Sequence, residues 1–294
     1  MLKNLLERLL TGVFYVLPHH LISRIVLFLS HSKNPWLSKL LIKLYTSIFP
    51  LNMSEAEESS QHAYASLNAL FTRALRSDAR PLADESFTLI SPADGVVSEF
   101  GSLQGDQLLQ AKGYHYSLQK LFADHSELAN DFTDGEFATI YLSPRDYHRM
   151  HMPITGQLTD MIYIPGRLFS VSPMTTRNIP EIFTRNERLV CVFKTAAGKV
   201  ALVLVGAINV AAIETVWAGL VTPPRGKVPQ HTHYENGIVL KRGIEMGRFN
   251  MGSTIIVLTE KDRIQWLDGF TKPAKIQLGN GLAIPSGAYR NKKV

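Results

Sequence analysis

The hydrophobic residues of this chain change their spacing near Phe87, and this change limits the folds that the chain can adopt. Before that point, apolar side chains recur every three or four residues, which is typical of amphipathic helices. After it, runs rich in β-branched residues are separated mostly by glycine, proline or asparagine, which is typical of strands joined by turns. Few long helical stretches lie between these runs, so alternating βαβ units are not predicted. The sequence therefore predicts an α+β fold, in which amino-terminal amphipathic helices precede a β-rich, mostly antiparallel body.

The expected strands of the body are short. They cover Thr88–Ile90, Val96–Phe100, Phe137–Leu142, Gln157–Ile164, Leu189–Lys194, Val200–Val210, Ile238–Leu240 and Thr254–Leu258. One helix is expected within the body, over Leu118–Leu128, because its apolar residues follow a helical period. A shorter helix is expected before the body, where Tyr64, Leu67, Phe71 and Leu75 share one side.

Three prolines, Pro18, Pro35 and Pro50, divide the first fifty residues into three segments that each predict an amphipathic helix. None of the segments supplies the roughly 20 uninterrupted apolar residues that a membrane-spanning helix needs. The fifty residues contain six lysines and arginines but only one acidic residue, Glu7. Basic and apolar residues that alternate in this way favour an anionic membrane surface over nucleic acid. The alternative is that these helices pack on the protein's own core.

The composition excludes several classes of protein. Hydrophobic residues make up 45% of the chain and charged residues 19%, which is too apolar for a disordered protein. The single cysteine, Cys191, lies in an apolar run and cannot form an internal disulfide. We expect it to be buried in a strand of a protein that folds in a reducing environment.

Two segments of the body contain candidate reactive residues. Residues Ser91–Gly95 place Asp94 in a turn between two expected strands, which by itself indicates only a turn. Residues 142–153 contain His148 and His151, together with two arginines, an aspartate and a tyrosine. The two histidines suit acid–base chemistry, because the pKa of histidine lies near physiological pH.

A metal site is the alternative interpretation of these histidines. The spacing of His148 and His151 could suit a metal, and His231 and His233 could add ligands. However, no acidic residue or cysteine stands at an evident ligand spacing nearby. The metal interpretation is therefore the weaker of the two.

A third segment, Gly252-Ser253-Thr254, precedes an expected strand and would ordinarily be a turn. Glycine has no Cβ, so the Ser253 hydroxyl can approach the carbonyl of Gly252 closely. If a base removes the hydroxyl proton, attack on that carbonyl converts the peptide bond into an ester. Elimination from the ester would cut the chain and leave dehydroalanine, which hydrolyses to a pyruvoyl group with loss of ammonia.

Taken in order along the chain, these segments resemble the phosphatidylserine decarboxylase family. The matching residues are Phe71–Arg73 with Ala79–Pro81, Ser91–Gly95, Lys112–Gly113 with Tyr116–Leu118, Pro144–Pro153, Asn186–Arg188, Met246–Gly247 and Met251–Thr254. The Gly-Ser-Thr form and the amphipathic amino-terminal region are similar to the bacterial and mitochondrial-type branch of the family.

The resemblance implies a proenzyme that cuts itself between Gly252 and Ser253. Ser253 would be the nucleophile, His151 its base, and Asp94 the residue that orients His151, which is the division of roles found in serine hydrolases. The products would be a β chain of residues 1–252 and an α chain of residues 253–294. The α chain would begin with a pyruvoyl group derived from Ser253.

The resemblance also implies decarboxylation of phosphatidylserine to phosphatidylethanolamine, in phospholipid biosynthesis. The pyruvoyl group would accept the electrons that are released as carbon dioxide leaves, so neither a metal nor pyridoxal phosphate is needed. His148 is assigned as the acid that returns a proton to the α carbon. Tyr141, which precedes the histidine segment, is assigned to the substrate side of the site, although packing within a strand explains it equally well.

A lipid substrate agrees with the basic amino-terminal helices. Residues 1–60 would form a membrane-associating helical region and linker, and residues 61–294 a catalytic domain. The lone cysteine and the absence of a small-x-small cleavage site favour a peripheral protein on the cytoplasmic face of a bacterial inner membrane. The resemblance further implies a homodimer, and no nucleic-acid partner is expected.

Three other interpretations remain open. A pyruvoyl-dependent decarboxylase of a soluble amino acid would not need the basic amphipathic helices. A metal-dependent hydrolase would use His148, His151, His231 and His233. A membrane-binding protein without enzymatic activity would stay a single intact chain.

Overall fold

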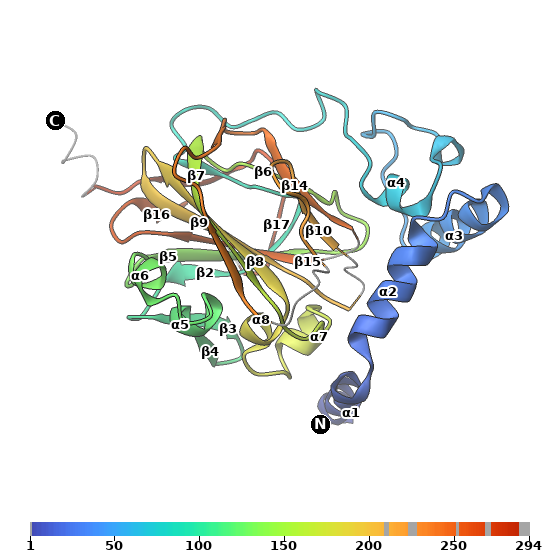
Figure 1. Cartoon of the computed structure of the whole chain (residues 1–294), viewed down its shortest axis with the longest axis horizontal. Coiled ribbons are helices and arrows are strands. Elements are labelled where there is room, and N and C mark those ends of the chain that lie inside the picture. Colours follow the sequence, from blue (N-terminus) through green and yellow to red (C-terminus); the bar gives the residue numbers. More distant parts are fainter. Residues whose placement is uncertain (1, 209–211, 223–227, 251–252, 268–271, 288–294) are drawn as a thin grey trace.

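The computed structural model describes residues 2–208, 212–222, 228–250, 253–267 and 272–287. Three helices come first, α1 (Leu2–Val16), α2 (His19–Ser30) and α3 (Pro35–Ile48), and they form an arm along one side of the body (Figure 1). Their bounds agree with the three segments predicted from the prolines. At the start of α3, the side chain of Asn34 accepts hydrogen bonds from the backbone N–H groups of Trp36 and Leu37, which caps the helix.

A large antiparallel sheet forms the centre of the body, with nine strands among the described residues. Its order is β12 (Gln230–His233), β7 (Gly156–Ile164), β8 (Arg188–Thr195), β9 (Gly198–Val205), β15 (Ser253–Thr259), β5 (Glu136–Leu142), β2 (Gly95–Ser102) and β17 (Ala274–Ile276), and β13 (Val239–Leu240) also pairs with β7. Every residue of β15 is buried, because β15 pairs with β9 on one side and β5 on the other. The start of β15 is therefore held in the interior of the protein.

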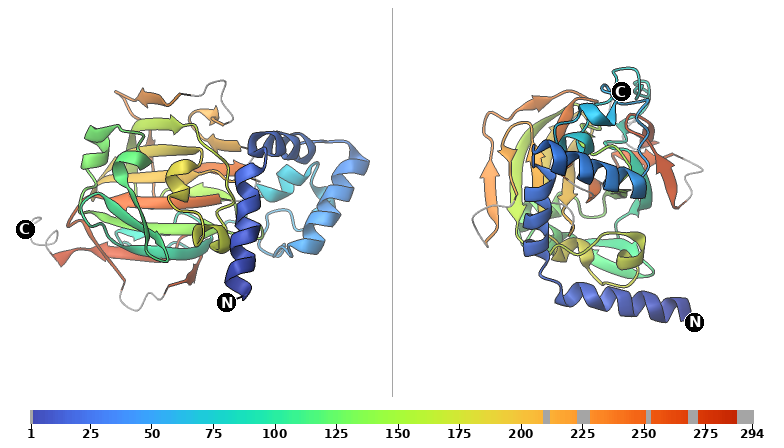
Figure 2. Two further views of the ribbon diagram at one scale, coloured as in Figure 1. Left: turned by 90° about the horizontal axis from the view of Figure 1, so that it is seen from below. Right: turned by 90° about the vertical axis from the view of Figure 1, so that its right-hand side faces the viewer.

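Smaller sheets and short helices surround this central sheet (Figure 2). One sheet has the order β11 (Gly219–Leu220), β10 (Ala212–Thr215), β14 (Glu245–Asn250) and β6 (Arg149–His151). A second sheet has the order β1 (Leu89–Ile90), β18 (Gly281–Pro285) and β16 (Ile264–Trp266). A third pairs β3 (Gln107–Ala111) with β4 (Tyr114–Ser117). The short helices are η1 (Gln61–Ala63), α4 (Leu67–Phe71), α5 (Leu118–Leu121), α6 (Ser126–Asn130), α7 (Pro173–Thr176) and α8 (Ile182–Arg185). The architecture is the predicted α+β fold, with antiparallel pairing in every sheet whose register is described.

Two predicted helices are shorter in the structure than the sequence indicated. The expected helix over Leu118–Leu128 is interrupted, because Ala123 and Asp124 adopt positive φ angles of 51° and 63°. Positive φ is unfavourable in a right-handed helix, so α5 and α6 form in place of one helix. The helix expected around Tyr64–Leu75 is reduced to the five residues of α4.

The amino-terminal helices are joined to the body at several points. Glu7 on α1 forms a salt bridge with Arg177, at 3.1 Å. The ring of His19 on α2 packs edge-on against Phe169, with ring centroids 5.0 Å apart. On α3, the Tyr45 hydroxyl donates a hydrogen bond to the Pro144 carbonyl. The third contact joins α3 to the loop that contains His148.

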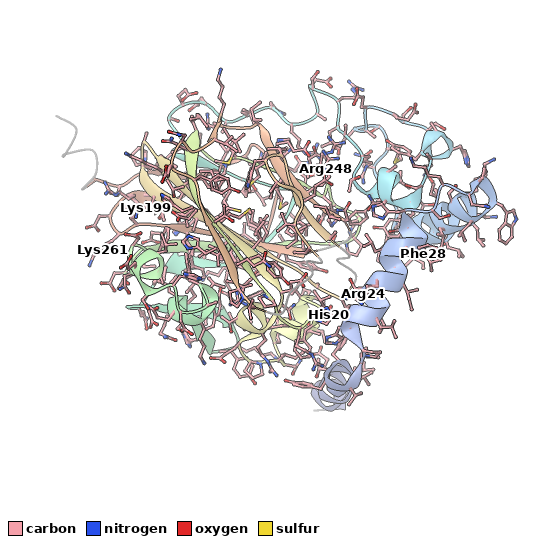
Figure 3. The ribbon with its side chains drawn as sticks, viewed as in Figure 1. His20, Arg24, Phe28, Lys199, Arg248 and Lys261 are labelled. Atoms are coloured by element: carbon pink, nitrogen blue, oxygen red, sulfur yellow. The ribbon has the colours of Figure 1, made fainter. Side chains whose placement is uncertain are left out.

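The same helices also leave large apolar side chains exposed. These include Val16, Leu21, Ile25, Phe28, Trp36, Leu44 and Ile48, each at least 49% exposed. Phe28 lies along α2 with His20 and Arg24 (Figure 3). No single helix among the described residues has both the length and the apolar character that crossing a membrane requires. The pair Leu10–Val16 and His19–Ser30 does so only in combination, and it is bent by 88°.

Candidate active site

Two connections between the central sheet and the β14–β6 sheet place the predicted site residues in one region. Strand β5 leads to β6 through the loop that contains His148, and β14 leads to β15 through Met251 and Gly252. The start of each connection lies beside the end of the other, because β5 pairs with β15 and β14 pairs with β6. The backbone N–H of Phe249 also donates to the His148 carbonyl, at 3.0 Å. The fold thereby brings the histidine loop to the end of β14, next to Phe249.

Ser253 is the first residue of β15 and is fully buried. Its Oγ atom has no hydrogen-bond partner among the described residues. Buried hydroxyl groups are usually hydrogen-bonded, so an unpartnered one calls for an explanation, and a reactive role is one of those. Gly252, on the other side of the predicted cleavage site, lies outside the described residues. Among the described residues, no side chain holds the Ser253 hydroxyl in place.

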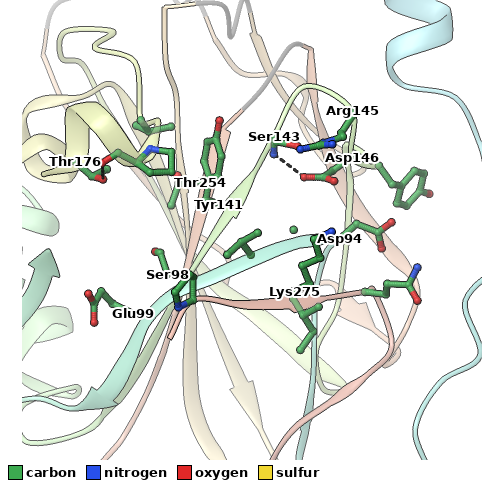
Figure 4. A pocket seen from close by; sticks show the side chains of 18 of the residues that line it. Asp94, Ser98, Glu99, Tyr141, Ser143, Arg145, Asp146, Thr176, Thr254 and Lys275 are labelled. Carbon is green, nitrogen blue, oxygen red and sulfur yellow. Dashed lines mark hydrogen bonds between the residues drawn. The ribbon is translucent and has the colours of Figure 1, made fainter. Parts of the chain in front are cut away.

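A pocket of about 1070 Å³ lies beside the start of β15, with Thr254 and Tyr141 in its wall (Figure 4). Thr254 and Tyr141 are register partners in β15 and β5, and both line this pocket. Successive side chains of a strand point to opposite faces of the sheet, so Ser253 points away from the pocket. One end of the pocket is lined by Pro50 and Asn52, directly after α3. Tyr141, predicted on the substrate side, is therefore a pocket residue next to the start of β15.

Asp94 is held by an arginine that the sequence analysis did not assign to the site. Arg80 donates to both carboxylate oxygens of Asp94, with Nε–Oδ1 at 3.0 Å and Nη2–Oδ2 at 2.6 Å. The same guanidinium also contacts Glu55, at 2.8 Å. The backbone N–H of Leu278 donates to Asp94 Oδ1, at 2.8 Å. Among the described residues, the side-chain partner of Asp94 is thus Arg80 and not His151. Arg80 lies in the Ala79–Pro81 match, which could have indicated it.

His151 lies near Asp94 and has two polar contacts of its own. Its backbone N–H donates to the Pro92 carbonyl, two residues before Asp94, at 2.8 Å. The ring atom Nδ1 lies 2.9 Å from the Gly243 carbonyl, and Nε2 lies 3.0 Å from the Tyr147 hydroxyl. A carbonyl oxygen can only accept, so Nδ1 carries the proton, and Nε2 accepts a hydrogen bond from Tyr147. His151 therefore presents a basic nitrogen that Tyr147 covers.

Burial is the main influence on the protonation of this imidazole. Burial lowers the pKa of His151, although the charge of Asp94 acts in the opposite direction. Burial also raises the pKa of Tyr147, which therefore stays protonated at neutral pH. Tyr147 was not among the predicted site residues. It lies in the Pro144–Pro153 match, four residues before His151, which could have indicated it.

His148 is fully buried in the same loop. Its Nδ1 lies 2.8 Å from the Asp146 carbonyl, so that nitrogen carries the proton. Its Nε2 is buried without a hydrogen-bond partner among the described residues, and its ring packs on Phe71, with centroids 4.0 Å apart. Burial lowers the pKa of His148 to about 3. The imidazole is therefore neutral at physiological pH when no ligand is present.

Two of the four histidines that the metal alternative would use form hydrogen bonds with an aspartate outside the histidine loop. His231 and His233 on β12 both contact Oδ1 of Asp160 on β7, each at 2.9 Å. Within the described ranges, no group of three or more histidine, cysteine, aspartate or glutamate side chains is arranged to hold a metal ion. The four-histidine ligand set of that alternative is not formed by these residues.

The comparisons with known proteins agree with one another on a single family. A family model described as phosphatidylserine decarboxylase matches residues 67–283, and a second one, described as PSD, matches residues 11–49. The phosphatidylserine decarboxylase proenzyme of Alkalilimnicola ehrlichii is 53% identical over 255 residues, which cover 86% of this chain and 88% of the relative. That of Pseudomonas aeruginosa strain UCBPP-PA14 is 46% identical over 285 residues, covering 96% and 99% of the two chains. That of Nitrosococcus oceani is 48% identical over 281 residues, covering 95% and 92%.

Proposed function

Because this chain belongs to the phosphatidylserine decarboxylase family, we propose that it matures by cutting itself between Gly252 and Ser253 and then works with a pyruvoyl group made from Ser253. The chain is a phosphatidylserine decarboxylase proenzyme of the bacterial type, and its reaction forms phosphatidylethanolamine and carbon dioxide. The observation that carries the proposal is the buried hydroxyl of Ser253 at the start of β15, which has no hydrogen-bond partner among the described residues.

In the maturation step, Ser253 Oγ attacks the carbonyl carbon of Gly252. The proton of the hydroxyl passes to Nε2 of His151, which becomes available when Tyr147 releases it. The amide nitrogen leaves from the carbonyl, and an ester replaces the peptide bond. Loss of the Ser253 α proton then breaks the ester, which cuts the chain and leaves dehydroalanine at position 253. One water molecule hydrolyses the dehydroalanine to the pyruvoyl group, and the nitrogen leaves as ammonia. The charge of Asp94 supports this step because it favours the protonated form of His151.

After cleavage, the fold holds the two chains together. The segment from residue 253 contributes β15, which lies between β9 and β5 of the other chain. It also contributes β17, which pairs with β2, and β18, which pairs with β1. The hydrogen bond from Leu278 to Asp94 adds a contact between the chains. These pairings support an enzyme made of an α chain and a β chain from one precursor.

In the decarboxylation step, the pyruvoyl group supplies an electron sink for the breaking bond. We assign His148 as the residue that returns a proton to the α carbon of the substrate. Its Nε2 is neutral and has no partner within the described ranges, and it takes up a proton more readily when the negative charges of the substrate lie beside it. Tyr141 and Thr254 line the pocket beside the start of β15, where they contact the bound headgroup. No residue in this assignment requires a metal or pyridoxal phosphate.

The amino-terminal helices bring this pocket to its lipid. Residues 1–60 form the membrane-associating region, since exposed apolar side chains lie along α1, α2 and α3 and six basic residues are interleaved with them. Pro50 and Asn52, directly after α3, line the pocket. Phosphatidylserine in an anionic bilayer can reach the pocket from that side. We place the protein on the cytoplasmic face of the inner membrane, as a homodimer whose catalytic domain covers residues 61–294.

Intact-mass spectrometry of the purified wild type and of a Ser253→Ala variant tests this function. The wild type should contain two chains, and the smaller one should be lighter by one ammonia than a peptide of residues 253–294. The variant should remain a single chain and release no carbon dioxide from phosphatidylserine labelled in its carboxyl group. An active wild type of full-length mass would overturn the self-cleavage mechanism. Release of carbon dioxide from free serine, but not from phosphatidylserine, would overturn the lipid substrate.

A further inference from the structure

Arg73 lies just after α4 and lines the pocket, yet only 4% of the residue is exposed. Its Nε and Nη1 atoms are buried and have no hydrogen-bond partner among the described residues. Arginine carries its charge at every accessible pH, and leaving a buried charge without a partner is costly. An arginine in this state at the wall of a pocket is suited to bind an anionic ligand.

The acidic residues nearest to Arg73 do not neutralise it. Asp94 and Glu55 both act on its charge at a distance, but each forms its short contacts with Arg80. In the part of the chain that the structure describes, no carboxylate forms an ion pair with Arg73. Burial accordingly lowers the pKa of Arg73. The guanidinium therefore keeps donors that are free for a ligand.

The surroundings of Arg73 place such a ligand close to the reacting groups. The ring of Phe71, two residues before Arg73, packs against the His148 ring, with centroids 4.0 Å apart. The carbonyl of Thr72 accepts a hydrogen bond from Arg149, at 2.9 Å, which fastens this segment to the histidine loop. The charge of Arg73 also lowers the pKa of His148. An anion bound to Arg73 thus lies within electrostatic reach of His148.

We propose that Arg73 binds the phosphodiester of the lipid substrate and is a specificity-determining residue of the pocket. This inference rests on the proposed function, because it identifies the group of phosphatidylserine that the pocket holds. The planar guanidinium suits a phosphate, since it presents parallel donors to two oxygen atoms.

The reaction itself favours the phosphodiester over the carboxylate of the same headgroup. The carboxylate loses its negative charge as carbon dioxide forms, so an arginine bound to it would stabilise the starting state more than the transition state. The phosphodiester keeps its charge throughout. Binding that group stabilises the starting state and the transition state equally, which lowers KM and leaves kcat unchanged.

The test uses the full-length, self-cleaved enzyme with Arg73→Gln, Arg73→Lys and the matched control Arg76→Gln. Arg76 lies three residues further on, is exposed and pairs with Asp78. The assays are cleavage into two chains, KM and kcat for phosphatidylserine in detergent micelles, and calorimetric binding of dihexanoyl-phosphatidylethanolamine. The last probe keeps the phosphodiester and lacks the carboxylate, so it distinguishes the two anions.

We expect all three variants to cleave normally. Arg73→Gln should raise KM and the Kd of the phosphatidylethanolamine probe by the same factor, about 10- to 100-fold, with kcat unchanged. Arg73→Lys should show a smaller increase, and Arg76→Gln none. Unchanged binding of the probe alongside a raised KM would assign the carboxylate to Arg73 and overturn the proposal, as would a fall in kcat at constant KM. Failure of both Arg73 variants to cleave would make Arg73 a folding or maturation residue. A wild type that does not cleave would count against the proposed function instead.

Discussion

The Tyr147 hydroxyl lies 3.0 Å from Nε2 of His151 and donates a hydrogen bond to it. The nitrogen that we assign as the base of maturation is therefore covered by a neighbour four residues earlier in the chain. Tyr147 must release Nε2 before His151 can accept the proton of Ser253. We therefore assign His151 as the base and Tyr147 as a hydrogen-bond donor that competes with Ser253 for Nε2.

We expect His151→Gln to slow self-cleavage by at least about 100-fold, because general base catalysis contributes that much or more. Tyr147→Phe removes only the competing donor, so cleavage should proceed close to the wild-type rate. The measurement is a time course of the full-length band on a denaturing gel after synthesis in a cell-free system. If Tyr147→Phe cleaves as slowly as His151→Gln, the hydroxyl takes part in maturation, and the assignment of His151 alone is wrong.

The unpartnered hydroxyl of Ser253 predicts the stability of the uncleaved variant. Ser253→Ala removes a buried group that makes no hydrogen bond, so the free energy of unfolding should fall by less than about 1 kcal/mol or rise slightly. Thr259→Val is a matched control, because Thr259 ends the same strand and its buried hydroxyl also lacks a partner. This control should cleave normally. Urea unfolding of Ser253→Ala, compared with an uncleaved His151→Gln protein, measures the effect, and a loss above about 2 kcal/mol would show that the hydroxyl is bonded.

The ion pair between Arg80 and Asp94 predicts a large loss of stability when one partner is removed. Their side chains are only 8% and 10% exposed, so Arg80→Met leaves a buried carboxylate without its cation. In the Ser253→Ala background, we expect the free energy of unfolding to fall by about 3–5 kcal/mol.

Arg76→Met provides the comparison, because the Arg76–Asp78 pair has the same 2.6 Å distance but is more than half exposed. Its loss should be below about 1 kcal/mol. Chemical unfolding curves measured at one pH give both values. Equal losses for the two variants would contradict a buried role for Arg80.

The lowered pKa of His148 predicts that the fold loses stability in acid. In the folded chain the pKa is about 3, against a model-compound value of 6.5 for the unfolded chain. As the pH falls below 6.5, His148 takes up a proton in the unfolded chain but not in the folded chain. The free energy of unfolding therefore decreases progressively from pH 6.5 towards pH 3.

Between pH 7 and pH 5, His148 should account for about 2 kcal/mol of this loss. We expect His148→Gln, in the Ser253→Ala background, to lose about 2 kcal/mol less than its parent over the same interval. The pKa values of His19, His125 and His151 are also lowered by burial, so part of the loss remains in the variant. Urea titrations at both pH values provide the measurement, and identical losses would show that His148 is accessible to protons in the folded state.

The exposed apolar side chains of the helices predict a requirement for the membrane surface. Phe28 and Trp36 are 77% and 75% exposed, and burial of such side chains in a bilayer interface is favourable. The double variant Phe28→Glu with Trp36→Glu should lower activity on phosphatidylserine vesicles by roughly tenfold or more, and much less on detergent-dispersed lipid. Val239→Glu, at a 63% exposed position on β13, is the control and should affect neither assay. Equal losses on vesicles and micelles would assign the helices to folding.

Local features of the sequence predicted the class of the fold and gave the hypothesis for the chemistry of the site. Pro18, Pro35 and Pro50 predicted the bounds of the three helices, because proline disfavours the helix interior wherever it occurs. The β-branched runs predicted the antiparallel body, and Gly252-Ser253 indicated a peptide bond open to attack by a neighbouring hydroxyl. These inferences depend on interactions between residues close in the chain, which a sequence displays directly.

Only the tertiary structure decided which groups contact one another. Asp94 is bound by Arg80 and by the backbone of Leu278, 184 residues away, and not by His151 as the family resemblance implied. The orienting role of Asp94 therefore stays a prediction. The partners of His151 likewise come from Tyr147 and from Gly243, 92 residues away.

The tertiary structure also decided which face of β15 borders the pocket. The register with β5 directs Thr254 towards the pocket and Ser253 towards the interior, although the two residues are adjacent. The alternation of side chains is a property of any strand, but which face borders a pocket depends on the elements packed around it. Contacts of this kind are set by strand register and by packing between distant segments, and the spacing of residues along one chain contains neither.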